Sequence, residues 1–155
     1  MSRPDSGRRL LWHGLLLFLL GLLTGLVVPA LQNPRMGLSA HLEGVMNGGF
    51  LAILGLAWEQ FVLPARAKAA LFWLALYGTY MNWVSTLLAA GLGTNRRTPI
   101  AGAGFGGPAW QENLIEVGLL SLSMAILAAV LLALWGLRRR MVTSPTTRGT
   151  GQPVG

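Results

Sequence analysis

Four long apolar runs dominate the chain, and short segments with polar or helix-breaking residues separate them. The runs cover residues 10–31, 38–63, 69–92 and 111–137. Each is long enough for a helix that crosses a hydrocarbon core, which takes roughly 20 residues. Lipid offers no hydrogen-bond partners to free backbone amides, so the pattern predicts an all-α, integral membrane protein with four transmembrane helices in a compact bundle.

The segments between the runs hold the residues that end helices. Asn33-Pro34 marks the first connection, Pro64 the second, and the glycine-rich run 102–108 the third. Beyond Arg140 the chain is rich in Thr, Pro and Gly, a composition typical of disorder. We therefore expect one four-helix transmembrane domain over residues 1–140 and a disordered cytoplasmic tail over residues 141–155.

Composition and charge support a lipid environment. Apolar residues make up 53% of the 155 positions and charged residues 11%, far from the roughly one quarter charged in soluble proteins. The absence of cysteine excludes disulfides, thiolate chemistry and cysteine-bound clusters. The net charge of +7 comes from basic residues at the ends of the runs, such as Arg138, Arg139 and Arg140. These are typical of topology signals, so no nucleic-acid partner is expected.

The distribution of basic residues also predicts the orientation. Lys and Arg in the N-terminal tail, the second connection and the C-terminal tail outnumber those in the first and third connections. The positive-inside rule then puts both termini in the cytoplasm of a multi-pass protein in a bacterial-type inner membrane. The first run is too long for a cleaved signal peptide, the alternative interpretation. Five tryptophans fall near span ends, as an interfacial belt requires: Trp12, Trp58, Trp73, Trp110 and Trp135.

Polar residues within spans are costly and therefore mark candidate chemistry. We expect the following to converge at similar depth: His41, Glu43, Asn47, Tyr80, Asn82, Glu112 and Glu116. Glu112 and Glu116, the two carboxylates of the fourth span, have three possible roles. They share a proton, act as general acid and base, or simply lie at the hydrated end of the span. His13, near the cytoplasmic end of the first span, is most simply an interfacial or packing residue.

The second span presents chemistry on two faces. At 100° per residue, His41, Gly44 and Gly48 share one face, whereas Glu43 and Asn47 share another. Glycines beside a histidine favour either close helix packing or a flat space for a porphyrin whose iron the histidine binds. No phosphate loop, dinucleotide fingerprint, zinc-type histidine pair or nucleophile triad is present in the sequence.

Three stretches resemble the hydroxylaminobenzene mutases. They are LWHG at 11–14, NPRMGLSAHLEGVMNG at 33–48 and AWQE at 109–112, and the resemblance extends over all four runs. It implies an isomerase that converts hydroxylaminobenzene to 2-aminophenol in the degradation of nitroaromatic compounds.

A more distant similarity links the chain to the styrene oxide isomerases. It rests on His13-Gly14 and on a histidine followed six residues later by Asn-Gly, here His41, Asn47 and Gly48. This resemblance implies haem b ligated by His41, with Gly44 and Gly48 beside it, and a homotrimer that holds haem at subunit boundaries. The acidic residue and tyrosine of that family fall on Gly78 and Thr86, so their roles do not transfer.

These observations lead to a mechanistic hypothesis. Haem iron held by His41 acts as a Lewis acid on the N-hydroxyl group, while Asn47 and Asn82 orient the aromatic substrate. Glu43, Glu116 or Tyr80 acts as the general acid or base. Two alternatives from other classes are a haem electron carrier, which normally needs two axial histidines, and a small proton-coupled drug exporter, which needs a membrane carboxylate.

Overall fold

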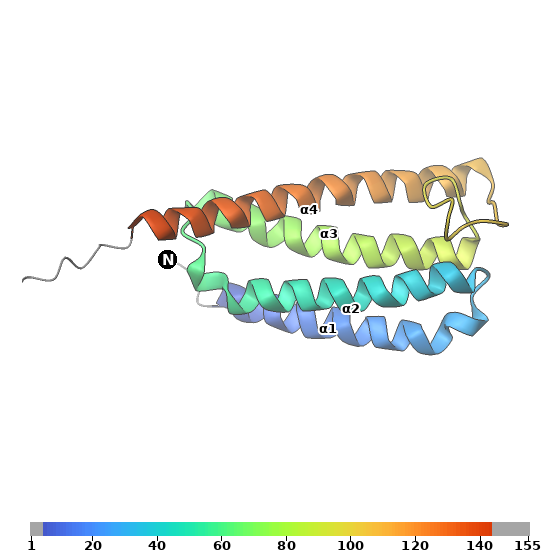
Figure 1. The fold of residues 1–155 in the computed structure, drawn as a ribbon, viewed down its shortest axis with the longest axis horizontal. Helices are drawn as coiled ribbons and strands as arrows, with labels where there is room; N and C mark the ends of the chain where they lie inside the picture. The colour runs from blue at the N-terminus through green and yellow to red at the C-terminus, as the bar shows by residue number, and fades with distance from the viewer. Residues whose placement is uncertain (1–4, 144–155) are drawn as a thin grey trace, which may run out of the picture.

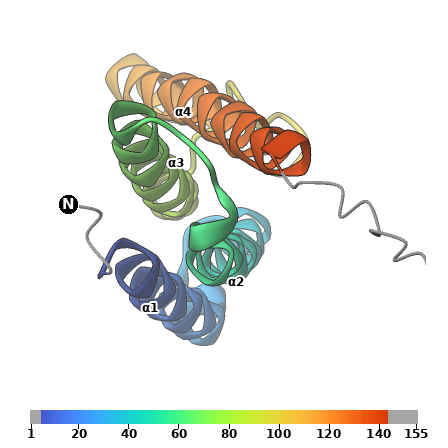
Figure 2. The same cartoon turned by 90° about the vertical axis from the view of Figure 1, so that its left-hand side faces the viewer.

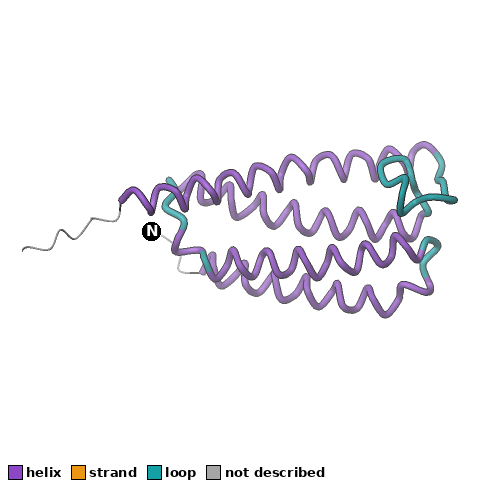
Figure 3. The backbone as a smooth tube through the Cα atoms, viewed as in Figure 1, coloured by secondary structure: helices purple, strands orange, loops and turns teal. Residues whose placement is uncertain are grey.

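The chain folds into four long helices in the computed structural model, which describes the backbone of residues 5–143 and the side chains of residues 6–138. They are α1 (Asp5–Val27), α2 (Pro34–Leu56), α3 (Ala65–Leu92) and α4 (Ala109–Thr143), with 3₁₀ turns η1 (Val28–Ala30) and η2 (Trp58–Gln60) (Figures 1 and 3). Over residues 5–143 there is no strand, so the predicted all-α class is confirmed.

The bounds of α2 differ from the predicted span 38–63. The helix starts at Pro34 because the Asn33 side chain accepts hydrogen bonds from the amides of Arg35 (3.1 Å) and Met36 (3.2 Å). Such a cap satisfies amides that have no partner inside the helix. The helix ends at Leu56, and η2 leads the chain to Pro64. The predicted helix was therefore too long at its C-terminal end.

At the opposite boundary of the bundle, α4 continues through Thr143, three residues beyond the predicted domain end at Arg140. The remainder of the predicted tail, residues 144–155, lies outside the described residues.

The helices form two pairs that meet mainly between α2 and α3, with a smaller contact between α1 and α3 (Figure 2). α1 packs along α2, α3 packs along α4, and α2 packs on α3. Within the described residues α4 packs mainly on α3 and on the η2 turn, and no Cα atom of α4 lies within 8 Å of one in α1 or α2. Buried side chains of all four helices join in one apolar cluster, which includes Leu17, Leu51, Leu71 and Ala129.

Glycine allows the closest of these contacts, between α1 and α2. A side-chain carbon added at Gly44 would lie 2.5 Å from the Cα atom of Gly21, and one added at Gly48 would lie 2.5 Å from the amide nitrogen of Phe18. Small residues at helix interfaces let backbones approach in this way. The α1–α2 pair therefore depends on glycine at these positions.

The two ends of the bundle carry different connections (Figure 1). The loop end holds the α1–α2 connection and residues 93–108 between α3 and α4, whereas the terminal end holds the α2–α3 connection and the outer ends of α1 and α4. α3 stops at the loop end because Gly93 adopts a left-handed conformation, with φ of 67°. We call these two ends of the bundle the loop end and the terminal end.

Two helices, over Ser6–Ala30 and Ala109–Arg138, are long and apolar enough to cross a membrane, with mean hydropathies of 2.2 and 2.6. The apolar runs of α2 and α3 are interrupted by polar side chains, including His41, Glu43 and Asn82. Four of the five tryptophans predicted to form a belt are exposed, but Trp58 is buried among Phe61 and Phe72. The expectation for Trp58 is therefore wrong.

Candidate functional site

Three of the predicted polar residues meet between α2 and α3. The side-chain amide of Asn47 donates a hydrogen bond of 3.1 Å to Oε2 of Glu43, and the amide of Asn82 donates to the same oxygen. All three side chains are half-buried. The predicted convergence of Glu43, Asn47 and Asn82 is confirmed, and we call them the Glu43 cluster.

The helices explain how the Glu43 cluster forms. Glu43 and Asn47 are four residues apart and so lie one above the other on α2. Asn82 reaches the same oxygen from α3, the helix that packs on this face of α2. Glu43 lies nine residues after the start of α2, so it is about 13 Å from the loop end of that helix. Both amides bind one carboxylate oxygen, which leaves Oε1 to accept a proton or a substrate hydrogen.

His41 points away from this cluster, toward α1. Its Nδ1 lies 2.8 Å from the backbone carbonyl oxygen of Gly21. A carbonyl can only accept, so Nδ1 carries a proton in this contact. Gly25 leaves room for the ring, because a side-chain carbon there would lie 2.8 Å from Nδ1. The half-buried imidazole is thus oriented by the Gly21 carbonyl, and Gly25 leaves room for it on α1.

Gly44 and Gly48 do share a face with His41, as predicted, but the face is already occupied. The backbone of α1 lies against both glycines at Gly21, Gly14 and Phe18. The predicted flat space for a porphyrin beside Gly44 and Gly48 is therefore filled within this chain. Their observed role is close helix packing, the other interpretation that the sequence left open.

Tyr80 does not join the Glu43 cluster. Two residues along a helix correspond to about 200°, so Tyr80 and Asn82 leave α3 on opposite sides. The Tyr80 hydroxyl lies 3.1 Å from Nδ1 of His13 and 3.3 Å from the His13 backbone oxygen, on the α1 side. The expectation that Tyr80 converges with Glu43 is wrong.

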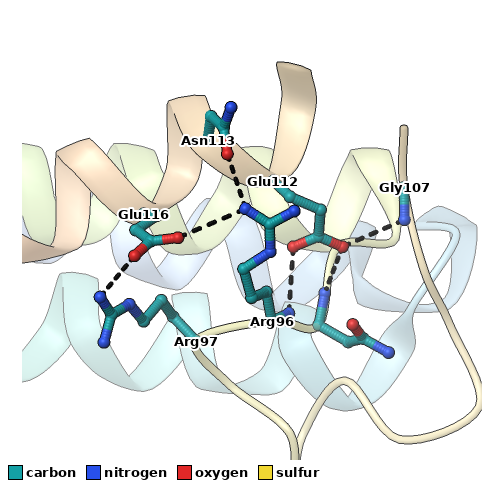
Figure 4. Close-up of polar contacts among 7 residues, drawn as sticks. Arg96, Arg97, Gly107, Glu112, Asn113 and Glu116 are labelled. Atoms are coloured by element: carbon teal, nitrogen blue, oxygen red, sulfur yellow. Dashed lines mark hydrogen bonds and ion pairs between the residues drawn. The ribbon is translucent and has the colours of Figure 1, made fainter. Parts of the chain in front are cut away.

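Glu112 and Glu116 are also separate from the Glu43 cluster, at the loop end (Figure 4). Glu112 is buried, and its carboxylate accepts the backbone amides of Asn95 (3.0 Å), Arg96 (3.0 Å) and Gly107 (3.1 Å). These bonds fasten both ends of the 93–108 loop to α4. The possibility that Glu112 shares a proton with Glu116 finds no support, because each carboxylate has its own partners.

Glu116 pairs with two arginines of the same loop (Figure 4). Its carboxylate lies 3.5 Å from Arg96 and forms a second ion pair with Arg97. The arginine side chains are nearly half exposed, so this network lies at the hydrated end of the span. That position is one of the three possibilities considered for the two carboxylates. The predicted convergence of Glu116 with Glu43 is therefore wrong.

Among the described residues no three His, Asp or Glu side chains gather in a way that could hold a metal ion. The two histidines contact different partners, His13 on Tyr80 and His41 on Gly21. They are not arranged as two axial ligands of one haem, which counts against the electron-carrier alternative.

Sequence reasoning missed the residues that build the loop end. The side chain of Asn33 also donates to the carbonyl of Ala101 (2.9 Å), and the Arg35 guanidinium donates to that of Ala103. The dipeptide Asn33-Pro34 is a recognisable capping signal, but no local signal indicates the partners of Arg96 and Arg97. A loop rich in glycine has too many possible paths for such pairs to be read from spacing.

Comparison with known proteins finds one family and two named relatives. The sequence model of the styrene oxide isomerase family matches residues 6–138. Hydroxylaminobenzene mutase HabB of Ectopseudomonas oleovorans is 53% identical over 148 residues, covering 95% of this chain and 88% of the relative. Hydroxylaminobenzene mutase HabA of the same organism is 45% identical over 127 residues, covering 81% of this chain and 94% of the relative. No solved structure matches the chain.

Both resemblances predicted from short stretches are thus confirmed over most of the chain, including the segment that holds His41 and the Glu43 cluster. The chain belongs to the styrene oxide isomerase family, and it is an isomerase.

Proposed function

We propose that this protein converts hydroxylaminobenzene, or a close arylhydroxylamine, to the 2-aminophenol by moving the hydroxyl oxygen from nitrogen to the ortho carbon. The Glu43 cluster carries the proposal, because it places a carboxylate with a free oxygen between two orienting amides. The names of two relatives at 53% and 45% identity support the substrate class.

The overall change balances without an electron partner. The N–O bond breaks, a C–O bond forms at the ortho carbon, the ortho carbon loses a proton, and the nitrogen gains one. Oε1 of Glu43 takes the ring proton as the aromatic system is restored and then returns a proton to the nitrogen. Asn47 and Asn82 hold the carboxylate, and their amide oxygens are acceptors for the substrate N–H. Exclusion of water favours oxygen transfer over a short distance within the site.

The chemistry of His41 fits a haem b ligand. Histidines that ligate iron or other metals usually donate their second ring N–H to a carbonyl or carboxylate, which fixes the tautomer. Here Nδ1 has such a partner in the Gly21 carbonyl at 2.8 Å, and Nε2 is left as the donor atom. When bound, a haem iron supplies a Lewis acid for a lone pair of the substrate.

A haem at His41 needs a second surface, because α1 fills the space beside Gly44 and Gly48. Another copy of the chain supplies that surface in the homotrimer that we propose. The helices carry large exposed apolar side chains for such contacts and for lipid, among them Leu26, Met46 and Met124.

We further propose that all four helices cross the membrane, with both termini in the cytoplasm. The even number of spans brings both termini to one side, as in the structure, where the start of α1 and the end of α4 lie at the terminal end (Figure 1). Arg66 and Lys68 in the first turn of α3, at that end, agree with the positive-inside rule.

The test combines product analysis with an absorption spectrum of the purified full-length protein. In water enriched with heavy oxygen, we expect 2-aminophenol that retains the original light oxygen, without added reductant. Heavy oxygen in most of the product would show that water attacks a freed intermediate, and absence of conversion would refute the proposed reaction.

His41→Ala isolates the haem proposal. It should remove the haem absorbance, whereas the matched variant His13→Ala should keep it, because His13 contacts Tyr80 and not a cofactor surface. Full haem absorbance in His41→Ala would overturn the ligand assignment, and a wild-type protein without haem would overturn the cofactor.

A further inference from the structure

A shallow, open groove lies between α1 and α3, two helices that contact each other only lightly. Its lining consists of His13, Trp73, Leu76, Tyr77 and Tyr80, and the atoms that face it are almost all carbon. A surface of this kind gains free energy when a hydrocarbon covers it, and it offers no hydrogen bonds to a polar ligand. The α1–α3 groove is therefore suited to an apolar chain.

Two cationic side chains pack on one pair of aromatic rings near this groove. The Arg9 guanidinium lies over the Phe72 ring, 5.0 Å from its centroid, and the Lys68 ammonium lies over the Trp58 ring at 5.4 Å. The two rings are 6.1 Å apart in an edge-to-face arrangement. Attraction to the ring faces restrains both cations. The same aromatic pair thus holds one positive charge from α1 and one from α3.

Helix geometry places these charges at the terminal end of the α1–α3 groove. Arg9 precedes His13 by four residues and Lys68 precedes Trp73 by five, so each cation lies roughly 6–8 Å nearer that end. Both helices run from the terminal end to the loop end (Figure 1). Trp73 is 61% exposed, and exposed tryptophans are typical of the level where headgroups meet hydrocarbon. The order from cations to apolar groove is that of a phospholipid from headgroup to chain.

The charge of the terminal end is complementary to an anionic headgroup. Among the side chains of residues 6–138, this end has five basic residues and one acidic residue, Glu59. The basic residues are Arg8, Arg9, Arg66, Lys68 and Arg138. At the loop end, by contrast, two arginines are already paired with Glu116. Basic residues near a membrane surface attract anionic lipids, so the terminal end is the favoured side.

We propose that an anionic phospholipid binds here, with its phosphate at Arg9 and Lys68 and one acyl chain in the α1–α3 groove. A guanidinium and an ammonium that rest on ring faces still have N–H groups for phosphate oxygens. The chain lies along α3 from Trp73 toward Tyr80, on the α1 side of that helix, whereas the Glu43 cluster lies between α2 and α3. The inference rests on the proposed membrane insertion and not on the proposed reaction.

The test measures lipid binding to the purified full-length protein by native mass spectrometry. The protein is titrated with phosphatidylglycerol and with phosphatidylcholine that has the same acyl chains. We expect phosphatidylglycerol to bind at least about 5-fold more tightly, because the attraction of an anionic lipid to one Lys or Arg corresponds to about a 5-fold change in affinity. Equal affinities would mean that the groove takes any lipid, and the proposal would fail.

Paired substitutions separate a specific site from general surface charge. Arg9→Gln combined with Lys68→Gln should abolish the preference for phosphatidylglycerol. Arg8→Gln combined with Arg66→Gln removes the same charge at the same end and should keep the preference. Arg8 lies about 100° from Arg9 around α1, and Arg66 about 200° from Lys68 around α3. Equal losses in the two double variants, both with the elution profile of wild type, would show diffuse attraction and overturn the site.

A photoreactive acyl chain tests the groove itself. Phosphatidylglycerol with a diazirine in one chain is added to the protein in nanodiscs. We expect it to label the segment from Trp73 to Tyr80 in the wild type, and several-fold less in the variant that lacks Arg9 and Lys68. Absence of label on that segment in the wild type would overturn the proposal. Cross-linking between copies at the same segment would then identify a second copy of the chain as what covers the groove.

Discussion

The carboxylates of the Glu43 cluster and of the loop end differ in what balances their charge. Glu116 has two arginines and Glu112 has three backbone amides, all from one loop. Glu43 has only two neutral side-chain amides, both on the same oxygen. A carboxylate whose acceptor sites are taken by fixed partners is suited to holding a loop. One with an open oxygen is suited to moving a proton.

Depth in the bundle strengthens this contrast. The loop-end carboxylates lie in the first two turns of α4, next to exposed arginines. Glu43 lies about 13 Å along α2 from the same end, among helices whose other faces are apolar. A low-dielectric setting strengthens electrostatic interactions with a bound substrate. The two regions therefore predict opposite responses to the same substitution.

The largest expected effect is on activity in Glu43→Gln. The change keeps the shape of the side chain but removes the proton acceptor, so we expect the turnover of hydroxylaminobenzene to fall about 100-fold or more. The elution profile in detergent should stay that of wild type. Glu116→Gln is the matched control, and an equal loss of activity in both variants would contradict the contrast between the regions.

A smaller loss is expected when one amide of the Glu43 cluster is removed. Asn47→Ala and Asn82→Ala each remove one hydrogen bond to a charged group, which contributes about 1.5–3 kcal/mol. Turnover should therefore fall by about 10-fold or more, and any haem absorbance should be retained. The control is Asn113→Ala, whose side chain binds Arg96 at the loop end (2.6 Å). Unchanged turnover in Asn47→Ala would make that residue a packing residue.

Much of the fold and part of the site follow from the sequence. Apolar runs gave the four helices, and the spacing of four residues put Glu43 and Asn47 on one face of α2. Tyr80 was misplaced although the spacing already separates it from Asn82, because two residues along a helix are about 200° apart; which of the two faces α2 is set by packing and did not follow. The sequence also could not decide whether Gly44 and Gly48, beside His41, serve close helix packing or a porphyrin site. That choice depends on which helix approaches this face of α2.

The loop end lay beyond prediction for a different reason. Arg96 and Arg97 meet Glu116 about 20 residues later, through a loop that includes Gly104 with φ of 87°. Positive φ at glycine permits turns that other residues rarely make. The path of the 93–108 loop is then determined by many weak contacts at once, including those of Asn33 and Asn95.

Stability, and not activity, should respond to Glu112→Ala. The substitution leaves the partly buried amides of Asn95, Arg96 and Gly107 without their acceptor, at a cost of about 1–3 kcal/mol for unsatisfied groups. We expect a lower midpoint of unfolding in a denaturing detergent titration, with turnover per folded molecule within about 3-fold of wild type. A loss of turnover like that of Glu43→Gln, in protein that is still folded, would assign Glu112 a chemical role.

The smallest effect should come from Glu116→Gln, because its ion pairs are partly exposed. The glutamate side chain is 24% exposed and the two arginine side chains 46% and 45%. Exposed ion pairs contribute little to stability and are screened by salt. The midpoint of unfolding should therefore differ slightly from wild type at low ionic strength, and the difference should shrink at 1 M salt. A large difference that persists at high salt would mean that Glu116 is desolvated like Glu112, and the loop end would then act as a single buried unit.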